Sequence, residues 1–226
     1  PASEADRDRI IDNIESYHIG GVIVMRTGPV SHSRFVNTIQ QKSDVPLLVG
    51  IEAVSGPGFS MDSISPLPPP LILNALRNDS LISAAAREIA RQMSLLQLNV
   101  NFLPLANTTT VGDPYPNKLL HFGSKAGYLR FATVFMKEMR EAGIIACAQQ
   151  DLRWDNSISP RTELLYHGIP DTSLFKPYRE LIAQGLPALM TTRLPYFYVE
   201  ENKGLPAFVS QLFVSENIER SLGFDG

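Results

Sequence analysis

Stretches with helical periodicity alternate along this chain with short runs of apolar residues. The strongest helical pattern covers residues 80–97, where apolar side chains recur at i, i+3, i+4 and i+7. Similar patterns predict helices at residues 4–18, 33–41, 125–141, 174–184 and 210–222. The runs between them are continuously apolar, which is typical of strands buried on both faces. These predicted strands lie near residues 22–25, 46–51, 100–105, 144–148 and 188–192.

Four of the predicted helices carry an apolar face that we expect to point inward. On the first helix this face comprises Ile10, Ile11, Ile14 and Tyr17. On the later helices it comprises Phe35, Val36, Ile39; Ile82, Ala85, Ala86, Ile89, Met93, Leu96; and Tyr128, Phe131, Phe135, Met136, Met139. The faces predict helices that pack against a sheet rather than stand alone in solvent.

Five successive strand–helix units predict an α/β fold, because sequential βα units place parallel strands side by side through right-handed crossovers. A (β/α) barrel and an open doubly wound sheet both fit this order. No G-x-G-x-x-G phrase follows the first strand, so a dinucleotide site is not indicated. A proline-rich loop at residues 53–70 interrupts the alternation, and loops of this length are often functional. We expect one domain over residues 1–226.

Composition excludes several classes of protein. Hydrophobic residues make up 44% and charged residues 19% of the 226 residues, which suits a packed core. The net charge of −3 gives no electrostatic footprint for nucleic acid. A single cysteine, Cys147, excludes an intrachain disulfide, and its apolar strand predicts an inert buried thiol. No apolar run reaches the roughly 18 residues of a membrane span.

The compartment stays open at this stage. The first residues are polar and charged and do not form a signal peptide, but a mature exported protein would also lack one. Both the cytoplasm and a bacterial cell envelope or periplasm therefore remain possible. No cofactor and no metal site is indicated, because His121 and His167 are far apart in sequence and belong to no ligand motif.

Several framework phrases of the chain resemble the N-terminal barrel domain of glycoside hydrolase family three, in its bacterial β-N-acetylglucosaminidase branch. They are IGGVI at 19–23, VPLLVG at 45–50, NFLP at 101–104, HFG at 121–123, ACA at 146–148, PYRELI at 177–182 and SLGFDG at 221–226. The resemblance implies a TIM-barrel-like (β/α) repeat. About five to six βα units would lie in this chain, so the barrel would be incomplete here. Either the natural protein would continue at both ends, or a partner chain or rearranged packing would cover the gap.

At the family's functional positions this sequence differs. The D-x-E-G-type turn reads EAVSG at residues 52–56, so Glu52 stands for the sugar-binding aspartate and Val54 for the glutamate. Asn107 stands for the aspartate that follows the N-F-x-P phrase, and Leu120 for the arginine of the R-S-F-G phrase. Arg193 stands for a histidine after a later strand.

The family's catalytic loops differ even more. Its K-H-F-P-G-H-G loop matches QQDLRWD at residues 149–155, which lacks the lysine and both histidines. The segment with the family's Asp-x-His acid/base pair reads NSISP at residues 156–160, and the nucleophilic aspartate would lie beyond Gly226. Retaining glycoside hydrolysis needs both a nucleophile and a proton donor. The resemblance therefore implies a member of the family that has lost catalysis.

The candidate site residues follow predicted strands or form a polar and aromatic cluster after the fourth one. The ligand-binding candidates are Glu52, Asn107, Asp151, Arg153, Trp154, Asp155 and Arg193. If any catalysis remains, its candidates are Glu52, Asp151 and Asp155. The alternatives without a ligand are a Glu52 carboxylate bonded to loop amides, and an Arg–Asp ion pair beneath a Trp154 lid.

Three functions stay open. The first is a catalytically inactive domain that binds carbohydrate, an amino sugar or a peptidoglycan fragment, or serves as a scaffold. The second is an active β-N-acetylglucosaminidase with a relocated acid and a nucleophile beyond Gly226. The third is a structural domain that positions a neighbour. The expected partners are a carbohydrate or cell-wall fragment, and a further domain of the same protein or a second copy of the chain.

Overall fold

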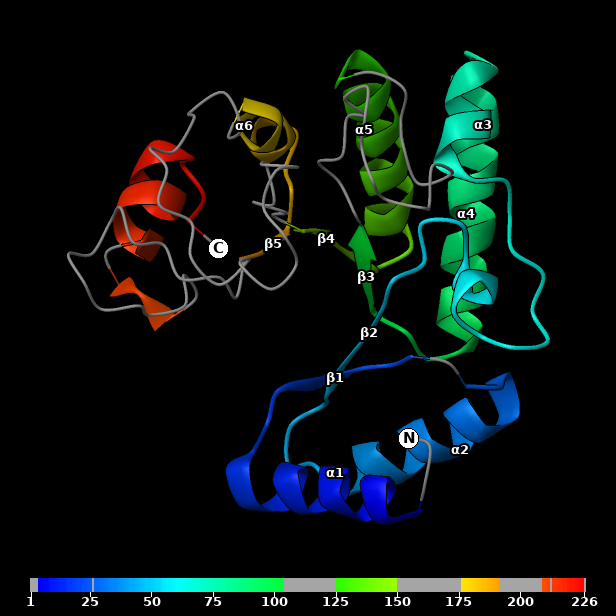
Figure 1. Ribbon diagram of the computed structural model, residues 1–226, viewed down its shortest axis with the longest axis vertical. Helices are drawn as coiled ribbons and strands as arrows, with labels where there is room; N and C mark the ends of the chain where they lie inside the picture. The colour runs from blue at the N-terminus through cyan, green and yellow to red at the C-terminus, as the bar shows by residue number, and fades with distance from the viewer. Residues whose placement is uncertain are drawn as a thin grey trace, which may run out of the picture. The chain divides into compact units, whose positions relative to one another are not determined.

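The computed structural model describes residues 4–25, 27–103, 125–149, 176–191, 209–211 and 213–225. Helices and strands alternate through these residues (Figure 1). The helices are α1 (Glu4–Tyr17), α2 (Pro29–Gln41), α3 (Pro70–Ala75), α4 (Asp79–Leu95), α5 (Lys125–Glu141) and α6 (Lys176–Ala183), with a 3-10 turn η1 (Pro57–Phe59) and a π-helix η5 (Phe213–Ser221). The strands are β1 (Gly21–Ile23), β2 (Leu48–Ile51), β3 (Val100–Leu103), β4 (Ile145–Gln149) and β5 (Ala188–Met190).

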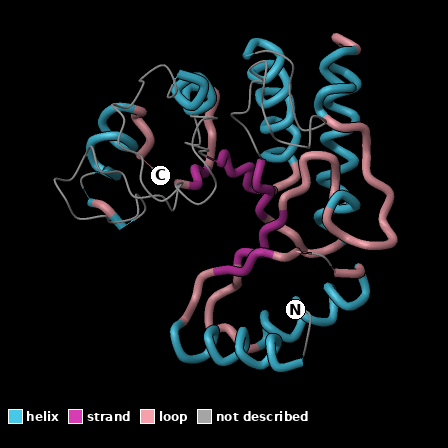
Figure 2. The backbone as a smooth tube through the Cα atoms, in the orientation of Figure 1, coloured by secondary structure: helices cyan, strands magenta, loops and turns pink. Residues whose placement is uncertain are grey.

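The strands form one five-stranded sheet in the order β1-β2-β3-β4-β5, drawn in magenta in Figure 2. The pairing is parallel, with Gly21 opposite Leu48 and Ile51 opposite Asn101. Strand order that follows chain order is that of a (β/α) barrel, whereas a doubly wound sheet reverses direction at a switch point. The TIM-barrel-like prediction is therefore confirmed. A closed barrel takes eight strands, so the five strands described here make an incomplete one.

Backbone contacts divide the chain into two compact units. The first comprises Pro1–Leu103 and Val134–Ala146, and the second comprises Pro104–Thr133 and Cys147–Gly226. Strands β1, β2 and β3 lie in the first unit, as does the long loop after β2. The site described below lies entirely within this first unit.

The predicted apolar faces of the helices are confirmed, with one exception. The face of α4 is buried at all six predicted positions, and so is the face of α5 at all five. In the first unit, Ile14 of α1 packs with Ile39 of α2 and with Leu47. Tyr17 was expected on the same face, but it is 76% exposed. It is the last residue of α1, where the chain turns away through His18 at φ +50°.

The first strand departs from its predicted burial. Ile23 is 61% and Met25 73% exposed, and Leu48 of β2 is also exposed. The prediction of a strand buried on both faces is therefore wrong for β1. In the sheet order β1 has one neighbour, β2, so one edge of β1 is without a strand in the described part of the chain. The prediction is confirmed for β4, whose residues Ala146, Cys147 and Ala148 are buried.

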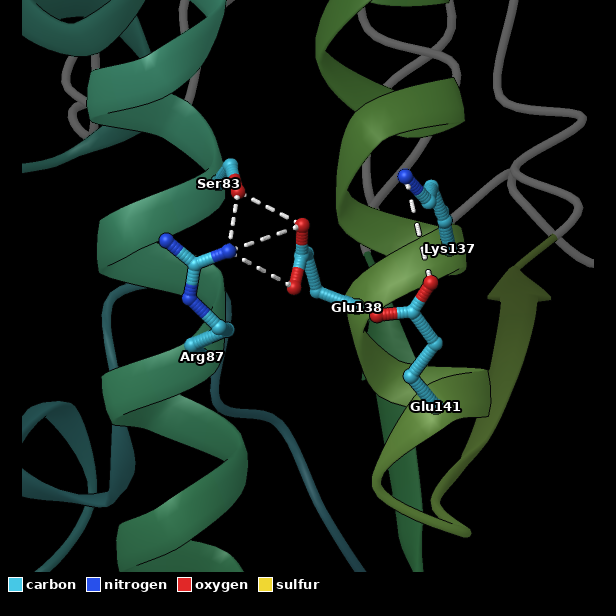
Figure 3. A network of polar contacts seen from close by, with 5 residues as sticks. All are labelled: Ser83, Arg87, Lys137, Glu138 and Glu141. Carbon is cyan, nitrogen blue, oxygen red and sulfur yellow. Dashed lines mark hydrogen bonds and ion pairs between the residues drawn. The ribbon is translucent and has the colours of Figure 1, made fainter.

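One buried charge links α4 to α5 (Figure 3). Ser83 Oγ donates to Glu138 Oε1 at 2.5 Å, and Arg87 Nη1 lies 3.4 Å from Glu138 Oε2. The Glu138 side chain is only 5% exposed, whereas Arg87 is largely exposed. Because a buried carboxylate needs partners, we assign this network a structural role in holding the two helices together.

Two elements differ from the sequence prediction in kind. Helix α3 falls outside the predicted helices and begins at Pro70, a residue whose fixed φ suits the first turn of a helix. The last predicted helix forms, but residues 213–221 adopt π geometry. Apolar residues spaced by four suit α and π turns alike, so the pattern could not distinguish the two.

Candidate functional site

Glu52 is the predicted site residue that the structure describes, and it directly follows β2. It lies at the carboxyl end of the strand, the end at which TIM-barrel enzymes place functional groups. The side chain is half-buried, and burial raises the pKa of its carboxyl group. No hydrogen bond or ion pair to this carboxylate occurs within the described residues. In the described residues, no loop amide donates a hydrogen bond to the Glu52 carboxylate, which was the alternative without a ligand.

The backbone around Glu52 is fixed by hydrogen bonds at successive residues. The Glu52 carbonyl accepts from Ser60 Oγ at 3.2 Å. The Ala53 N–H donates to Asn101 Oδ1 at 3.0 Å, and the Ala53 carbonyl accepts from Asn101 Nδ2 at 3.3 Å and from Gly56 N at 3.1 Å. These bonds make residues 53–56 a closed turn. Glu52 therefore leaves the sheet from a preorganised backbone.

The rest of the loop at residues 53–70 is equally well bonded. The Leu67 N–H donates to the Ser55 carbonyl at 2.8 Å, and Met61 forms a parallel bridge with Thr27. At Gly58 the chain passes so close to itself that a Cβ atom would lie 2.7 Å from Pro66 N. Only glycine allows such an approach. The loop is thus a defined structure beside Glu52.

Val54 is buried within the same turn. Its side chain is 1% exposed, and the neighbouring Ala53 is fully buried. By the resemblance, Val54 occupies the position of a glutamate in the family's turn. In this chain the position belongs to the apolar core, and Glu52 is the carboxylate that the turn presents.

The remaining candidates lie outside the described residues. They are Asn107, Asp151, Arg153, Trp154, Asp155 and Arg193, together with His121 and His167. Whether they gather around Glu52 stays a prediction. Sequence reasoning missed Asn101 and Ser60, which hold the Glu52 turn. The NFLP phrase that contains Asn101 was one of the framework phrases shared with the family, but it did not indicate which group the Asn101 amide binds.

The structure also describes the single cysteine and other side chains that could bind a metal ion. The Cys147 thiol is buried, as predicted, and burial raises its pKa to about 11, which disfavours the reactive thiolate. No group of three or more histidine, cysteine, aspartate or glutamate side chains suitable for a metal ion occurs among the described residues. None of the helices in that part of the chain combines the length and apolar character needed to cross a membrane.

Comparison with solved structures gives similar folds over most of this chain. A glycoside hydrolase family 3 β-N-acetylglucosaminidase from Paenibacillus sp. str. FPU-7 matches 100% of this chain and 44% of its own, with 24% identity and a TM-score of 0.75. NagZ from Neisseria gonorrhoeae, solved with N-trifluoroacetyl-D-glucosamine, matches 99% of this chain and 69% of its own, with 18% identity and a TM-score of 0.75.

A more distant structure shows the same fold. The β-glucoside phosphorylase BglX matches 92% of this chain and 40% of its own, with 15% identity and a TM-score of 0.73. The chain thus spans less than half the length of BglX and of the Paenibacillus enzyme. No curated protein sequence matches it. The family model described as glycosyl hydrolase family 3 N terminal domain matches residues 3–226, so the chain belongs to this family.

Proposed function

We propose that this domain binds an amino-sugar carbohydrate, such as a peptidoglycan fragment, without hydrolysing it. The observation that carries the proposal is Glu52, a half-buried carboxylate without a protein partner among the described residues, at the carboxyl end of β2. A carboxylate accepts hydrogen bonds from sugar hydroxyls, and such charge-assisted bonds are strong. The amino-sugar class follows from the likeness to gonococcal NagZ, which was solved with an N-acylated glucosamine analogue.

The absence of hydrolysis is argued from the sequence. Residues 149–155 lack the lysine and histidines of the family loop, and residues 156–160 lack its acid/base pair. Val54, buried beside Glu52, removes a further carboxylate. Loss of one general acid or base lowers a rate by about 10²–10⁴. Without such groups the remaining contacts support binding rather than turnover.

Titration of the full chain with N-acetylglucosamine, followed by isothermal calorimetry, tests the binding. We expect saturable binding that Glu52→Gln weakens about tenfold or more, because a hydrogen bond to a charged acceptor contributes about 1.5–3 kcal/mol. The matched control is Glu141→Gln on α5, whose carboxylate pairs with Lys137, and this variant should bind like the wild type. If Glu52→Gln binds as tightly as the wild type, Glu52 is not part of the binding site. If the wild type itself does not bind, a scaffold or structural domain is favoured.

One observation favours a second candidate, an active glycosidase. Burial raises the pKa of Glu52, and a general acid near neutral pH needs a raised pKa. In this alternative Glu52, Asp151 or Asp155 donates the proton, and the nucleophile lies beyond Gly226. Hydrolysis of a chromogenic substrate distinguishes the two candidates.

A further inference from the structure

We propose that Asn101 is the positioning residue of Glu52. Its side-chain amide, reaching from β3, fixes the peptide unit from which the Glu52 side chain departs. The inference deepens the proposed function and rests on the role given to Glu52 there. The residue acts through the backbone of Ala53.

Strands β2 and β3 cease to pair directly before the Glu52 turn. The last ladder pair of the two strands joins Ile51 to Asn101. Beyond it, the Ala53 N–H and carbonyl are bonded by the two polar atoms of the Asn101 amide, at 3.0 and 3.3 Å. A side-chain amide offers the same donor and acceptor as a peptide group. Asn101 thus extends the pairing of the sheet past the end of β2.

The peptide unit between Glu52 and Ala53 is held at both of its polar atoms. Asn101 accepts from its N–H, and Ser60 Oγ donates to its carbonyl at 3.2 Å. Because the two bonds fix the orientation of this peptide plane, they fix the direction in which the Glu52 side chain leaves the backbone. A group that only stabilised the loop would have no such direct connection to Glu52.

Burial makes Asn101 suitable for this role. The residue is fully buried, and its Nδ2 also lies 3.9 Å from Met139 Sδ on α5. A side chain held by packing on all sides keeps a single geometry, which a positioning group needs. Removal of the amide would leave the buried polar groups of Ala53 without this partner, so the turn would have to rearrange.

The chain contains a matched control two residues earlier, directly before β3. Asn99 Oδ1 accepts from the Val49 N–H at 2.7 Å, and Asn99 Nδ2 lies 3.5 Å from the Leu47 carbonyl. Asn99 therefore bonds to the beginning of β2 as Asn101 bonds to its end. The two asparagines share their chemistry, but only Asn101 touches the Glu52 turn.

The test follows the titration of the Glu52 carboxyl by carbon-13 NMR, with the signal assigned through Glu52→Gln. In the wild type, burial raises the pKa of Glu52 above its ordinary 4.5. We expect Asn101→Ala to move this pKa back toward 4.5 by more than half of the elevation, because the released turn hydrates the carboxyl. Asn99→Ala should leave the pKa unchanged. An unchanged pKa in Asn101→Ala, or equal changes in both variants, would overturn the proposal.

A second measurement needs no variant and decides the question if Asn101→Ala does not fold. Amide hydrogen exchange in the wild type should show the Ala53 N–H protected about 100-fold or more relative to an unbonded amide. Exchange of Ala53 at the unprotected rate would overturn the proposal. Neither measurement uses a sugar, so the two proposals can fail separately. If Asn101→Ala changes the pKa of Glu52 but Glu52→Gln still binds N-acetylglucosamine normally, the positioning role is supported and the proposed function is rejected.

Discussion

His32 is a buried imidazole on α2 with one satisfied nitrogen. Its Nε2 lies 2.7 Å from the Leu96 carbonyl, and because a carbonyl accepts, Nε2 carries the proton. Nδ1 is buried and has no hydrogen-bond partner among the residues that the structure describes. Protonation would place a charged N–H there without an acceptor. Burial accordingly lowers the pKa of His32, and the bond to Leu96 opposes this only in part.

The lowered pKa of His32 predicts acid sensitivity with a definite sign. The unfolded chain takes up a proton near pH 6.5 and the folded chain at lower pH, so stability is full above that value and falls as the pH drops through it. We expect the melting temperature to fall between pH 8 and pH 5. In His32→Phe the fall should be smaller, although the lost bond to Leu96 costs about 1 kcal/mol at pH 8.

The control for this prediction is His18→Asn. His18 is exposed, lies 3.7 Å from Asp44 and has a positive φ that asparagine tolerates. This variant should show the full wild-type fall in melting temperature. If His32→Phe loses as much stability on acidification as the wild type does, His32 is not the source of the acid sensitivity.

For single residues, the sequence predicts the place of a residue in the fold better than it predicts the residue's hydrogen-bond partners. The place of Glu52 at the end of β2 follows from the apolar run before it. The bond from Asn101 to Ala53 spans 48 positions of sequence and has no periodicity, so no local pattern reveals it. The burial of His32 was missed for a similar reason, because its acceptor is the carbonyl of Leu96, 64 positions away.

The loop between β2 and α3 is the element on which the site depends most. Its prolines exclude a strand or a long helix, which predicts a loop but not its path. The path depends on Gly58, where a side chain would meet the backbone of residues 64–66. Helix α4, by contrast, has strict apolar periodicity and an N-cap, Asn78, whose side chain accepts from Ser80 N. Helices with regular apolar periodicity and a capping residue, such as α4, are the elements that the sequence predicts.

We expect Gly58→Ala to destabilise the first unit by about 1–3 kcal/mol, since an added methyl group in a tightly packed place forces the backbone to move. Urea denaturation measures the loss. The control is Gly20→Ala, because a Cβ atom at Gly20 would meet nothing within 4 Å. Equal stability of the two variants would show that the close approach at Gly58 is not required.

At the scale of the whole molecule, the order of the strands and the family model agree. A sheet that runs from β1 to β5 in chain order is the arrangement of a (β/α) barrel, and the match over residues 3–226 assigns the chain to glycosyl hydrolase family 3. The alternation of helices and strands predicts a parallel α/β fold but fits a barrel and a doubly wound sheet alike, and the barrel was implied by the family resemblance. The exposure of Ile23 and Met25 could not be predicted, because an apolar run does not say how many neighbours its strand has.

We propose that this family 3 domain binds its carbohydrate but does not cleave it. The most direct measurement is release of the chromophore from an aryl β-N-acetylglucosaminide by the purified chain. We expect a rate no higher than the background, because by the resemblance residues 149–160 lack the acid/base groups of the family loops. Turnover that persists through purification and disappears in Glu52→Gln or Asp151→Asn would contradict it.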